Sequence, residues 1–187
     1  MEDKALEILR LYLGRRGLDT KTERIVTEDL KRSNAYTIGK VLVIFSQKDK
    51  VLDSDISAFL QFARANEFGQ GVILVGLSHP SDNVLKVIKS YAKDRVQFFA
   101  LRHLQFDITT HRMCVPHRIL KEDERKALFD KYTITEPEEQ LPWIDSQDIQ
   151  VRILGGVPGD VIEITRHSDV AGTDVYYRYC VEDVNVA

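Results

Sequence analysis

Three apolar runs of strand length most strongly constrain the fold of this chain. They are KVLVIF at 40–45, GVILVGL at 71–77 and RVQFFAL at 95–101. None of them alternates apolar with polar residues, which is typical of strands whose two faces are both covered by helices. Amphipathic helical stripes lie around these runs, and this order predicts an α/β domain with a mainly parallel sheet and flanking helices. The expected helices span 4–13, 54–67, with Ser54 as N-cap, and 80–92.

The pattern of apolar and turn-forming residues changes after Phe106. The apolar runs become shorter, and glycines and prolines separate them more often. This part of the chain predicts a small α+β domain at 108–187, following the α/β domain at 1–107. Its expected strands are 113–120, 160–166 and 175–181, its expected helices are 121–132 and 146–154, with Ser146 as N-cap, and 136–145 is expected to be an extended loop.

Charge is divided unevenly between the two expected domains. Residues 1–107 hold 17 Lys/Arg and 14 Asp/Glu, for +3, whereas residues 108–187 hold 9 and 15, for −6. The positive part is able to approach nucleic acid, while DNA phosphates would repel the acidic part. No apolar run approaches the roughly 20 residues of a membrane helix, and the acidic start MEDKALEILR is unlike a signal peptide, so no membrane partner is expected.

The two cysteines and five histidines do not predict a metal site. His111 and His117 flank Cys114, but no second cluster supplies the remaining ligands of a zinc site. Cys114 and Cys180 have no pairing pattern, so they are expected to be free thiols in a reducing compartment. We expect Cys180 to be a buried apolar residue and the chain to hold no metal or cofactor.

The second half of the chain carries an ordered series of short sequence matches to one known family. The matches are, in order, His111, Val115-Pro116-His117, Lys131-Tyr132, Gln140-Leu141-Pro142, Asp148, Arg152, Gly155, Pro158-Gly159-Asp160, Ile164-Thr165-Arg166, Ser168, Ala171-Gly172 and Tyr176-Tyr177-Arg178. With this series, the module resembles the RNA polymerase subunit called H in archaea, which is the C-terminal domain of the fifth subunit shared by eukaryotic nuclear polymerases.

The resemblance implies a structural subunit without catalytic residues of its own, present once in a multisubunit DNA-dependent RNA polymerase. Its C-terminal domain would anchor on the largest subunit, and residues 1–107 would correspond to a jaw domain near downstream duplex DNA. The expected subunit-interface residues are Pro116, His117, Gln140, Leu141, Pro142, Trp143, Arg152, Gly155, Gly159, Arg166, Ser168, Gly172, Tyr177 and Arg178.

One short segment of the first half adds to the resemblance. Ser78-His79-Pro80-Ser81 is similar to the Thr-Pro-Ser-Ala turn by which the family's jaw faces downstream DNA. A helix that begins here would offer backbone N–H groups and a positive dipole end to a phosphate. The expected DNA contacts are His79, Pro80, Ser81 and Lys86. The alternative is that Ser78 or Ser81 only caps the helix.

Several polar and aromatic side chains of the second half have two interpretations. Arg152, Arg166 and Arg178 either bind carboxylates or carbonyls of a large partner subunit or pair within the module. The internal acids available to them are Asp148, Asp160 and Glu163. Trp143 either anchors an interface or packs over the core of its own module.

At three positions the chain departs from the family pattern. Trp143 stands where a basic residue is common, Ile149 where Pro is usual and Val170 where Thr is usual. These departures suggest a divergent member: a protist paralogue, a polymerase-specific isoform or a subunit encoded by a large DNA virus. The expected location is the nucleus for a cellular subunit, or the virion or cytoplasmic viral factory for a viral one.

Two competing functions remain. A metal-dependent nuclease of the restriction-enzyme type would use an acid followed by Asp/Glu-x-Lys, and Asp29-Leu30-Lys31 and Glu124-Arg125-Lys126 fit that tripeptide. Neither tripeptide falls at the end of an expected buried strand, where metal ligands would converge. An independent nucleic-acid-binding adaptor is disfavoured by the weak basicity of the first half.

Overall fold

The structure is a computed structural model of the chain. It describes residues 1–26, 33–48, 50–66, 68, 70–168 and 172–185; for Asp53 and Ser168 it describes the backbone alone. The chain forms two compact units, Met1–Ile108 and Thr109–Ala187. No helix within the described residues is long and apolar enough to cross a membrane.

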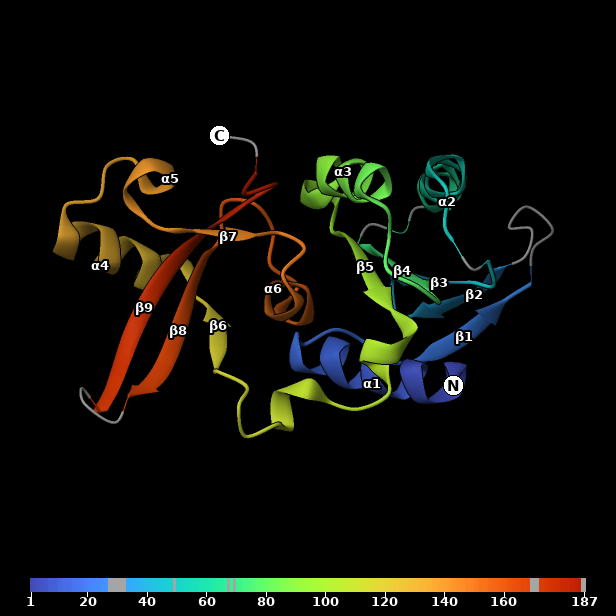
Figure 1. Cartoon of the computed structure of the whole chain (residues 1–187), viewed down its shortest axis with the longest axis horizontal. Helices are drawn as coiled ribbons and strands as arrows, with labels where there is room; N and C mark the ends of the chain where they lie inside the picture. Colours follow the sequence, from blue (N-terminus) through green and yellow to red (C-terminus); the bar gives the residue numbers. More distant parts are fainter. Residues whose placement is uncertain (27–32, 49, 67, 69, 169–171, 186–187) are drawn as a thin grey trace. The chain divides into compact units, whose positions relative to one another are not determined.

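The first unit is built on a five-stranded sheet (Figure 1). Its strands lie in the order of the sequence: β1 (Thr22–Ile25), β2 (Ser33–Ile38), β3 (Val41–Ser46), β4 (Val72–Gly76) and β5 (Val96–Ala100). The pairs β3–β4 and β4–β5 are parallel, while β1–β2 and β2–β3 are antiparallel. The expectation of a mainly parallel sheet was therefore wrong, because two antiparallel strands extend it at one side.

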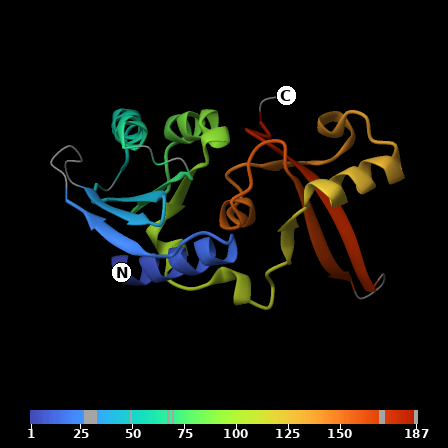
Figure 2. The ribbon, with the colours of Figure 1, turned by 180° about the vertical axis from the view of Figure 1, so that it is seen from behind.

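Helices cover both faces of this sheet (Figures 1 and 2). Helix α1 (Glu2–Arg15) lies on one face, and α2 (Asp53–Ala65) and α3 (Asp82–Ser90) lie on the other. Every residue of β3, β4 and β5 is buried as a result, as the unbroken apolar runs predicted. Ser54 is not the N-cap of α2. That position is Leu52, whose N–H donates to the Asp55 carboxylate at 3.1 Å.

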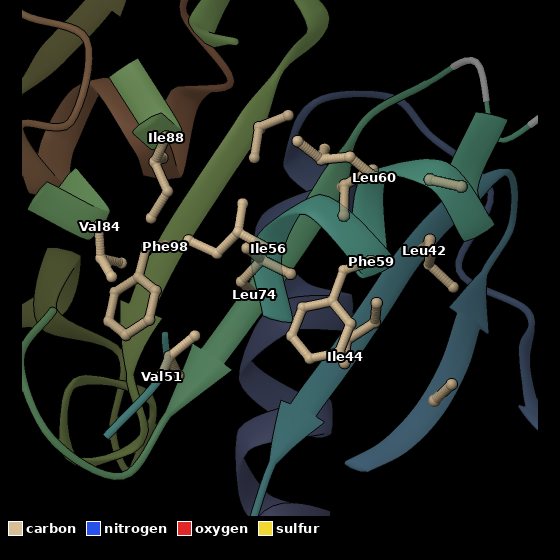
Figure 3. Close-up of a cluster of buried hydrophobic side chains, with 14 residues drawn as sticks. Leu42, Ile44, Val51, Ile56, Phe59, Leu60, Leu74, Val84, Ile88 and Phe98 are labelled. Carbon is tan, nitrogen blue, oxygen red and sulfur yellow. The ribbon is translucent and has the colours of Figure 1, made fainter. Parts of the chain in front are cut away.

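The core between the sheet and α2 and α3 is made of interlocking aliphatic and aromatic side chains (Figure 3). Ile56 and Phe59 of α2 and Ile88 of α3 point toward Ile44, Leu74 and Phe98 of the strands. All six are at most 5% exposed. Burial of each such side chain stabilises the fold by about 1.5–3 kcal/mol relative to exposure.

Three short 3₁₀ turns lie among and after these elements in the described chain: η1 (Ala92–Asp94), η2 (Leu101–Leu104) and η3 (Ile108–Thr110).

The second unit contains a four-stranded sheet in the order β6-β8-β9-β7. The strands are β6 (His117–Ile119), β7 (Trp143–Asp145), β8 (Val161–Ser168) and β9 (Gly172–Val181), and the helices are α4 (Glu122–Tyr132), α5 (Pro137–Gln140) and α6 (Ile149–Leu154). Strands β8 and β9 form a long antiparallel pair, which is seen from both sides in Figures 1 and 2. Among the described strand pairs of this sheet, β7–β9 alone is parallel, so this sheet is mixed like that of the first unit.

Alternation along β8 divides the core of this unit between two faces. Val161 packs with Leu128 of α4, whereas Ile162 and Ile164 pack with Val151 of α6. Cys180 lies in the α6-side cluster and is fully buried, so its predicted role as a small apolar residue is confirmed.

Three expected elements of the second unit were wrong in part. The strand expected at 113–120 is confined to β6, and the loop expected at 136–145 contains α5 and β7. The helix expected from Ser146 begins three residues later, at Ile149, because Asp148 accepts a hydrogen bond from Gln150 N–H as its N-cap. The Ser146 hydroxyl instead donates to the Glu182 carbonyl at 2.9 Å.

Candidate functional site

The turn that follows β4 lies at the carboxyl edge of the three parallel strands. Gly76 ends the strand in a position where a Cβ would lie 2.6 Å from Cζ of Phe98. A residue with a side chain would therefore collide with a core aromatic ring. The glycine lets the chain leave the sheet here and place the turn 78–81 at this edge.

Ser81 closes the turn by capping α3. Its Oγ accepts a hydrogen bond from Val84 N–H at 3.5 Å, and its carbonyl accepts from Leu85 N–H at 2.8 Å. His79 and Lys86 are exposed, and Pro80 is half-buried. Of the two capping serines that the sequence offered, the structure uses Ser81.

A hollow of about 340 Å³ adjoins this turn. It is lined by residues from the beginnings of α2 and α3, namely Leu52, Ser54, Ser81, Asn83 and Val84. The positive ends of the two helix dipoles therefore lie near the same small space. Asp82, in the first turn of α3, offsets part of this positive field.

Two basic residues that sequence reasoning missed complete this edge. Arg102 and His103 belong to η2, directly after β5. The Arg102 guanidinium contacts Nε2 of His79, and Arg102 Nε lies 3.4 Å from Nε2 of His103. The two imidazole rings are 5.3 Å apart between centroids. A basic pair immediately after a buried strand, at the same sheet edge as the 78–81 turn, was the available signal.

In the second unit, Trp143 and Arg178 are tied to each other. Arg178 Nη1 donates to the Trp143 carbonyl at 2.8 Å, and Trp143 Nε1 donates to the Glu138 carbonyl. The indole is half-buried. Both polar groups therefore bind backbone carbonyls within the module, and the partner of Arg178 is not one of the acids considered for it.

Gln140 and its neighbours also make internal contacts. The Gln140 side-chain carbonyl accepts from the backbone N–H groups of Thr135 and Glu136, at 2.8 and 2.9 Å. Leu141 packs against the α4-side core, and the carbonyl of exposed Pro142 accepts from Tyr179 N–H at 2.9 Å.

Arg152 and Arg166 have different surroundings. Burial lowers the pKa of the Arg152 guanidinium to about 10, and the negative charges of Asp148 and Asp145 act in the opposite direction. The exposed Arg166 guanidinium lies 5.3 Å from the centroid of the Tyr176 ring, a cation–π contact. Of the acids considered as arginine partners, Asp148 is near Arg152. Asp160 and Glu163 have other partners, Asp160 accepting from Val157 N–H at 2.8 Å and Glu163 pairing with Arg118.

The remaining expected interface residues shape the backbone or lie on separate parts of the unit. Gly155, Gly159 and Gly172 all have positive φ, and Gly155 ends α6. The other members are Pro116, whose carbonyl accepts from Thr165 N–H, His117, whose Nδ1–H donates to the Val115 carbonyl at 2.6 Å, and Tyr177, which packs on the α4 side. The side chain of Ser168 and residues 169–171, which include Val170 and Ala171, lie outside the description.

The far end of the β8–β9 pair is an exposed part of the second unit. We call residues 165–167 and 172–176 the outer ribbon. All five residues from Gly172 to Tyr176 are exposed, including Val175 at 41% and Tyr176 at 46%. Strand β6 pairs with β8 only at 162–164, and β7 pairs with β9 only at 179–181. Within the described residues, the outer ribbon thus has no strand on either edge.

The residues of the nuclease hypothesis do not assemble a site in the described part of the chain. Glu124 accepts two hydrogen bonds from Arg118, both at 2.8 Å. Asp29-Leu30-Lys31 lies outside the described residues. Where the structure describes side chains, no three metal-ligating groups cluster.

Comparison with known proteins identifies the family. Residues 106–180 match the model of the RNA polymerase Rpb5 C-terminal domain. DNA-directed RNA polymerase subunit Rpo5 of Pyrococcus horikoshii is 51% identical over 79 residues, which are 42% of this chain and 94% of that protein. The chain belongs to the Rpb5/Rpo5 family, the fifth subunit of DNA-directed RNA polymerases.

Other relatives extend this assignment. Rpo5 of Methanosarcina mazei is 41% identical over 78 residues, 97% of its length. DNA-directed RNA polymerase V subunit 5A of Arabidopsis thaliana is 28% identical over 159 residues, which are 85% of this chain and 69% of that protein. The predicted family is confirmed, and with it the prediction of a structural subunit of a multisubunit RNA polymerase. The nuclease and adaptor alternatives are not favoured.

Proposed function

We propose that the second unit anchors this Rpb5/Rpo5 family member on the largest subunit of an RNA polymerase, in one copy per complex. The observation that carries this proposal is the outer ribbon. A strand whose two faces and free edge are exposed offers side chains and backbone hydrogen-bonding groups to a partner. Val175 and Tyr176 supply the apolar part of such a contact.

The internal contacts of Trp143, Arg178 and Gln140 refine the expected interface. These side chains hold α5, β7 and β9 together, so they support the surface rather than provide its free polar groups. The outer ribbon, where the Arg166 guanidinium lies over the Tyr176 ring, has exposed groups available to a partner. An aromatic ring beside an arginine is a frequent composition of interface anchors.

We infer that the first unit corresponds to the jaw domain, with the turn 78–81 toward downstream duplex DNA. The inference is supported by exposed His79, Ser81 and Lys86 at the start of α3. The charge of +3 on residues 1–107 is compatible with a neighbouring duplex, whereas −6 on residues 108–187 favours contact with protein. We place the complex in the nucleus for a cellular subunit, and in the virion or cytoplasmic viral factory for a virus-encoded one.

Co-purification of the tagged full-length chain tests the anchoring proposal. We expect the two largest polymerase subunits among its partners, and we expect Val175→Asp with Tyr176→Asp to remove them. Met113→Asp is the matched control, because Met113 is an apolar side chain, 74% exposed, outside the ribbon. Absence of large polymerase subunits from the wild-type preparation would contradict the proposal, as would retention of them by the ribbon variant.

Crosslinking of the assembled polymerase to downstream duplex DNA tests the jaw proposal. Ser81→Glu combined with Lys86→Glu places negative charge at the beginning of α3 and is expected to reduce crosslinking to this subunit several-fold, since phosphates repel it. Unchanged crosslinking in an enzyme of normal composition would count against a contact at this turn.

A further inference from the structure

We propose that Arg102, held between His79 and His103, binds a phosphodiester of duplex DNA. This inference rests on the proposed position of the first unit near DNA, and it adds a site on η2 to the turn that the family resemblance indicated. The three side chains come from two loops at the carboxyl ends of adjacent parallel strands, β4 and β5.

The contacts of Arg102 fix its position without neutralising it. Its guanidinium contacts His79 Nε2, and its Nε lies 3.4 Å from His103 Nε2. A guanidinium has donors and no acceptor, so in both contacts the imidazole nitrogen is the acceptor. The histidines therefore orient the arginine while leaving its full positive charge.

Two other arginines of this protein are oriented by carboxylates. Arg15 pairs with Asp107 at 2.6 Å, and Arg118 pairs with Glu163 at 2.7 Å. Within the described residues, no carboxylate makes an ion pair with Arg102, whose side chain is exposed. A guanidinium has five N–H donors, and the two histidine contacts leave several of them for another acceptor.

Two oxygens of one phosphate fit the N–H donors of Arg102 that the histidines leave unused. The planar guanidinium fork binds phosphate through two parallel hydrogen bonds, and pre-positioning by the histidines reduces the conformational entropy lost on binding. Because backbone phosphates are alike in every sequence, the contact would add affinity without sequence preference.

The test uses assembled polymerase containing the full chain, bound to a downstream duplex. Arg102→Ala should weaken duplex binding about threefold to fivefold, in the range of an exposed ion pair, and lower the slope of log affinity against log salt by about 0.9. Arg102→Lys keeps the charge but loses the fork, so it should restore most of the salt slope and only part of the affinity. Arg24→Ala is the matched control, since Arg24 is an exposed arginine on β1, at the opposite edge of the same sheet.

Replacing single phosphates of the duplex by neutral methylphosphonates locates the partner. One such duplex should weaken wild-type binding and have no additional effect on the Arg102→Ala enzyme. Duplex binding is also measured with added inorganic phosphate and, as a control, with added chloride at the same ionic strength. This comparison separates a DNA contact from a site for free anions. Selective competition by phosphate at micromolar concentration would overturn the assignment to a phosphodiester of DNA.

The outcomes separate this inference from the proposed function. If the Ser81→Glu, Lys86→Glu enzyme loses crosslinking while Arg102→Ala behaves like Arg24→Ala, the Arg102 site is overturned and the jaw proposal stands. If no phosphate replacement and no variant of this edge changes binding, both are overturned. The site is supported if Arg102→Ala lowers the slope of log affinity against log salt while Arg24→Ala does not, and if the melting temperature of the isolated Arg102→Ala chain is unchanged.

Discussion

Arg118 and Glu163 face each other across β6 and β8 and are joined by two parallel hydrogen bonds. Nε of Arg118 donates to Oε1 of Glu163 at 2.7 Å, and Nη2 donates to Oε2 at 2.9 Å. The remaining fork nitrogen binds Glu124 in the first turn of α4. One guanidinium thus links two strands and a helix, and the pKa of Arg118 is raised by these carboxylates.

We expect Arg118→Ala to lower the free energy of unfolding of the second unit by about 1 kcal/mol, as for a bidentate surface network. Arg118→Lys should recover little, because a single ammonium cannot reproduce the fork. Urea unfolding followed by the fluorescence of Trp143, the only tryptophan, measures this unit. Arg112→Ala, another exposed arginine of the same unit, is the control. Equal effects of Arg112→Ala and Arg118→Ala would show that the network is not stabilising.

Gln140→Ala should destabilise the second unit by about 0.5–1.5 kcal/mol, because it removes the acceptor shared by two exposed backbone N–H groups, which water then solvates. Gln140→Glu keeps an acceptor oxygen in the same place and should retain most of the stability at pH 7. The same Trp143 fluorescence measurement applies. A neutral effect of both substitutions on unfolding, together with loss of polymerase association, would instead place Gln140 in the interface itself.

Gly76→Ala should destabilise the first unit by about 1–3 kcal/mol, since its Cβ would overlap Phe98 in a packed core. Hydrogen exchange of the β4 and β5 amides reports on this unit. Gly14→Ala is the control: its Cβ would lie 3.3 Å from the Thr20 methyl group, and alanine favours helix. Unchanged exchange in Gly76→Ala would mean that the ring moves aside readily.

Cys180 should make the second unit sensitive to alkaline pH. Burial raises the pKa of its thiol from 9.0 to about 12 in the folded protein. Below pH 9 both folded and unfolded thiols are protonated, so this group contributes no pH dependence. Between about pH 9 and 12 only the unfolded thiol ionises, and stability falls by up to about 1.4 kcal/mol per pH unit.

The measurement compares wild type with Cys180→Ala at pH 8 and pH 10.5. From pH 8 to pH 10.5 the wild type should lose about 2 kcal/mol more than the variant, which has no thiol to ionise at this position. Titrating groups common to both proteins cancel in the difference. Parallel losses in the two proteins would contradict a buried neutral thiol.

The sequence predicted those parts of the fold in which one physical signal dominates. The apolar runs of β3, β4 and β5 required cover on both faces, and the structure provides it. Strands β1 and β2 were missed because their partly exposed residues mix polar with apolar types. The two-residue connection Gly39-Lys40, with Gly39 at positive φ, was the local signal of a hairpin that could have revealed β2.

The sequence allowed us to predict which residues of the candidate sites carry polar groups, but not which of those groups contact each other. Ser81 was one of two serines considered as a helix cap, yet the pairing of His79 with Arg102 depends on two loops 23 residues apart in sequence. Likewise, the internal partners considered for Arg178 were acids, whereas its guanidinium binds a backbone carbonyl, that of Trp143. Local propensity identifies which residues have polar groups, whereas strand order decides which of those groups meet.

The outer ribbon also limits how much of the chain can exist unassembled. A strand with open edges and apolar side chains is a template on which a second copy can add its own strand. Any excess over the partner subunit would therefore tend to self-associate or to be removed by proteolysis. The surface proposed to anchor the subunit thus also sets an upper bound on the concentration of free chain.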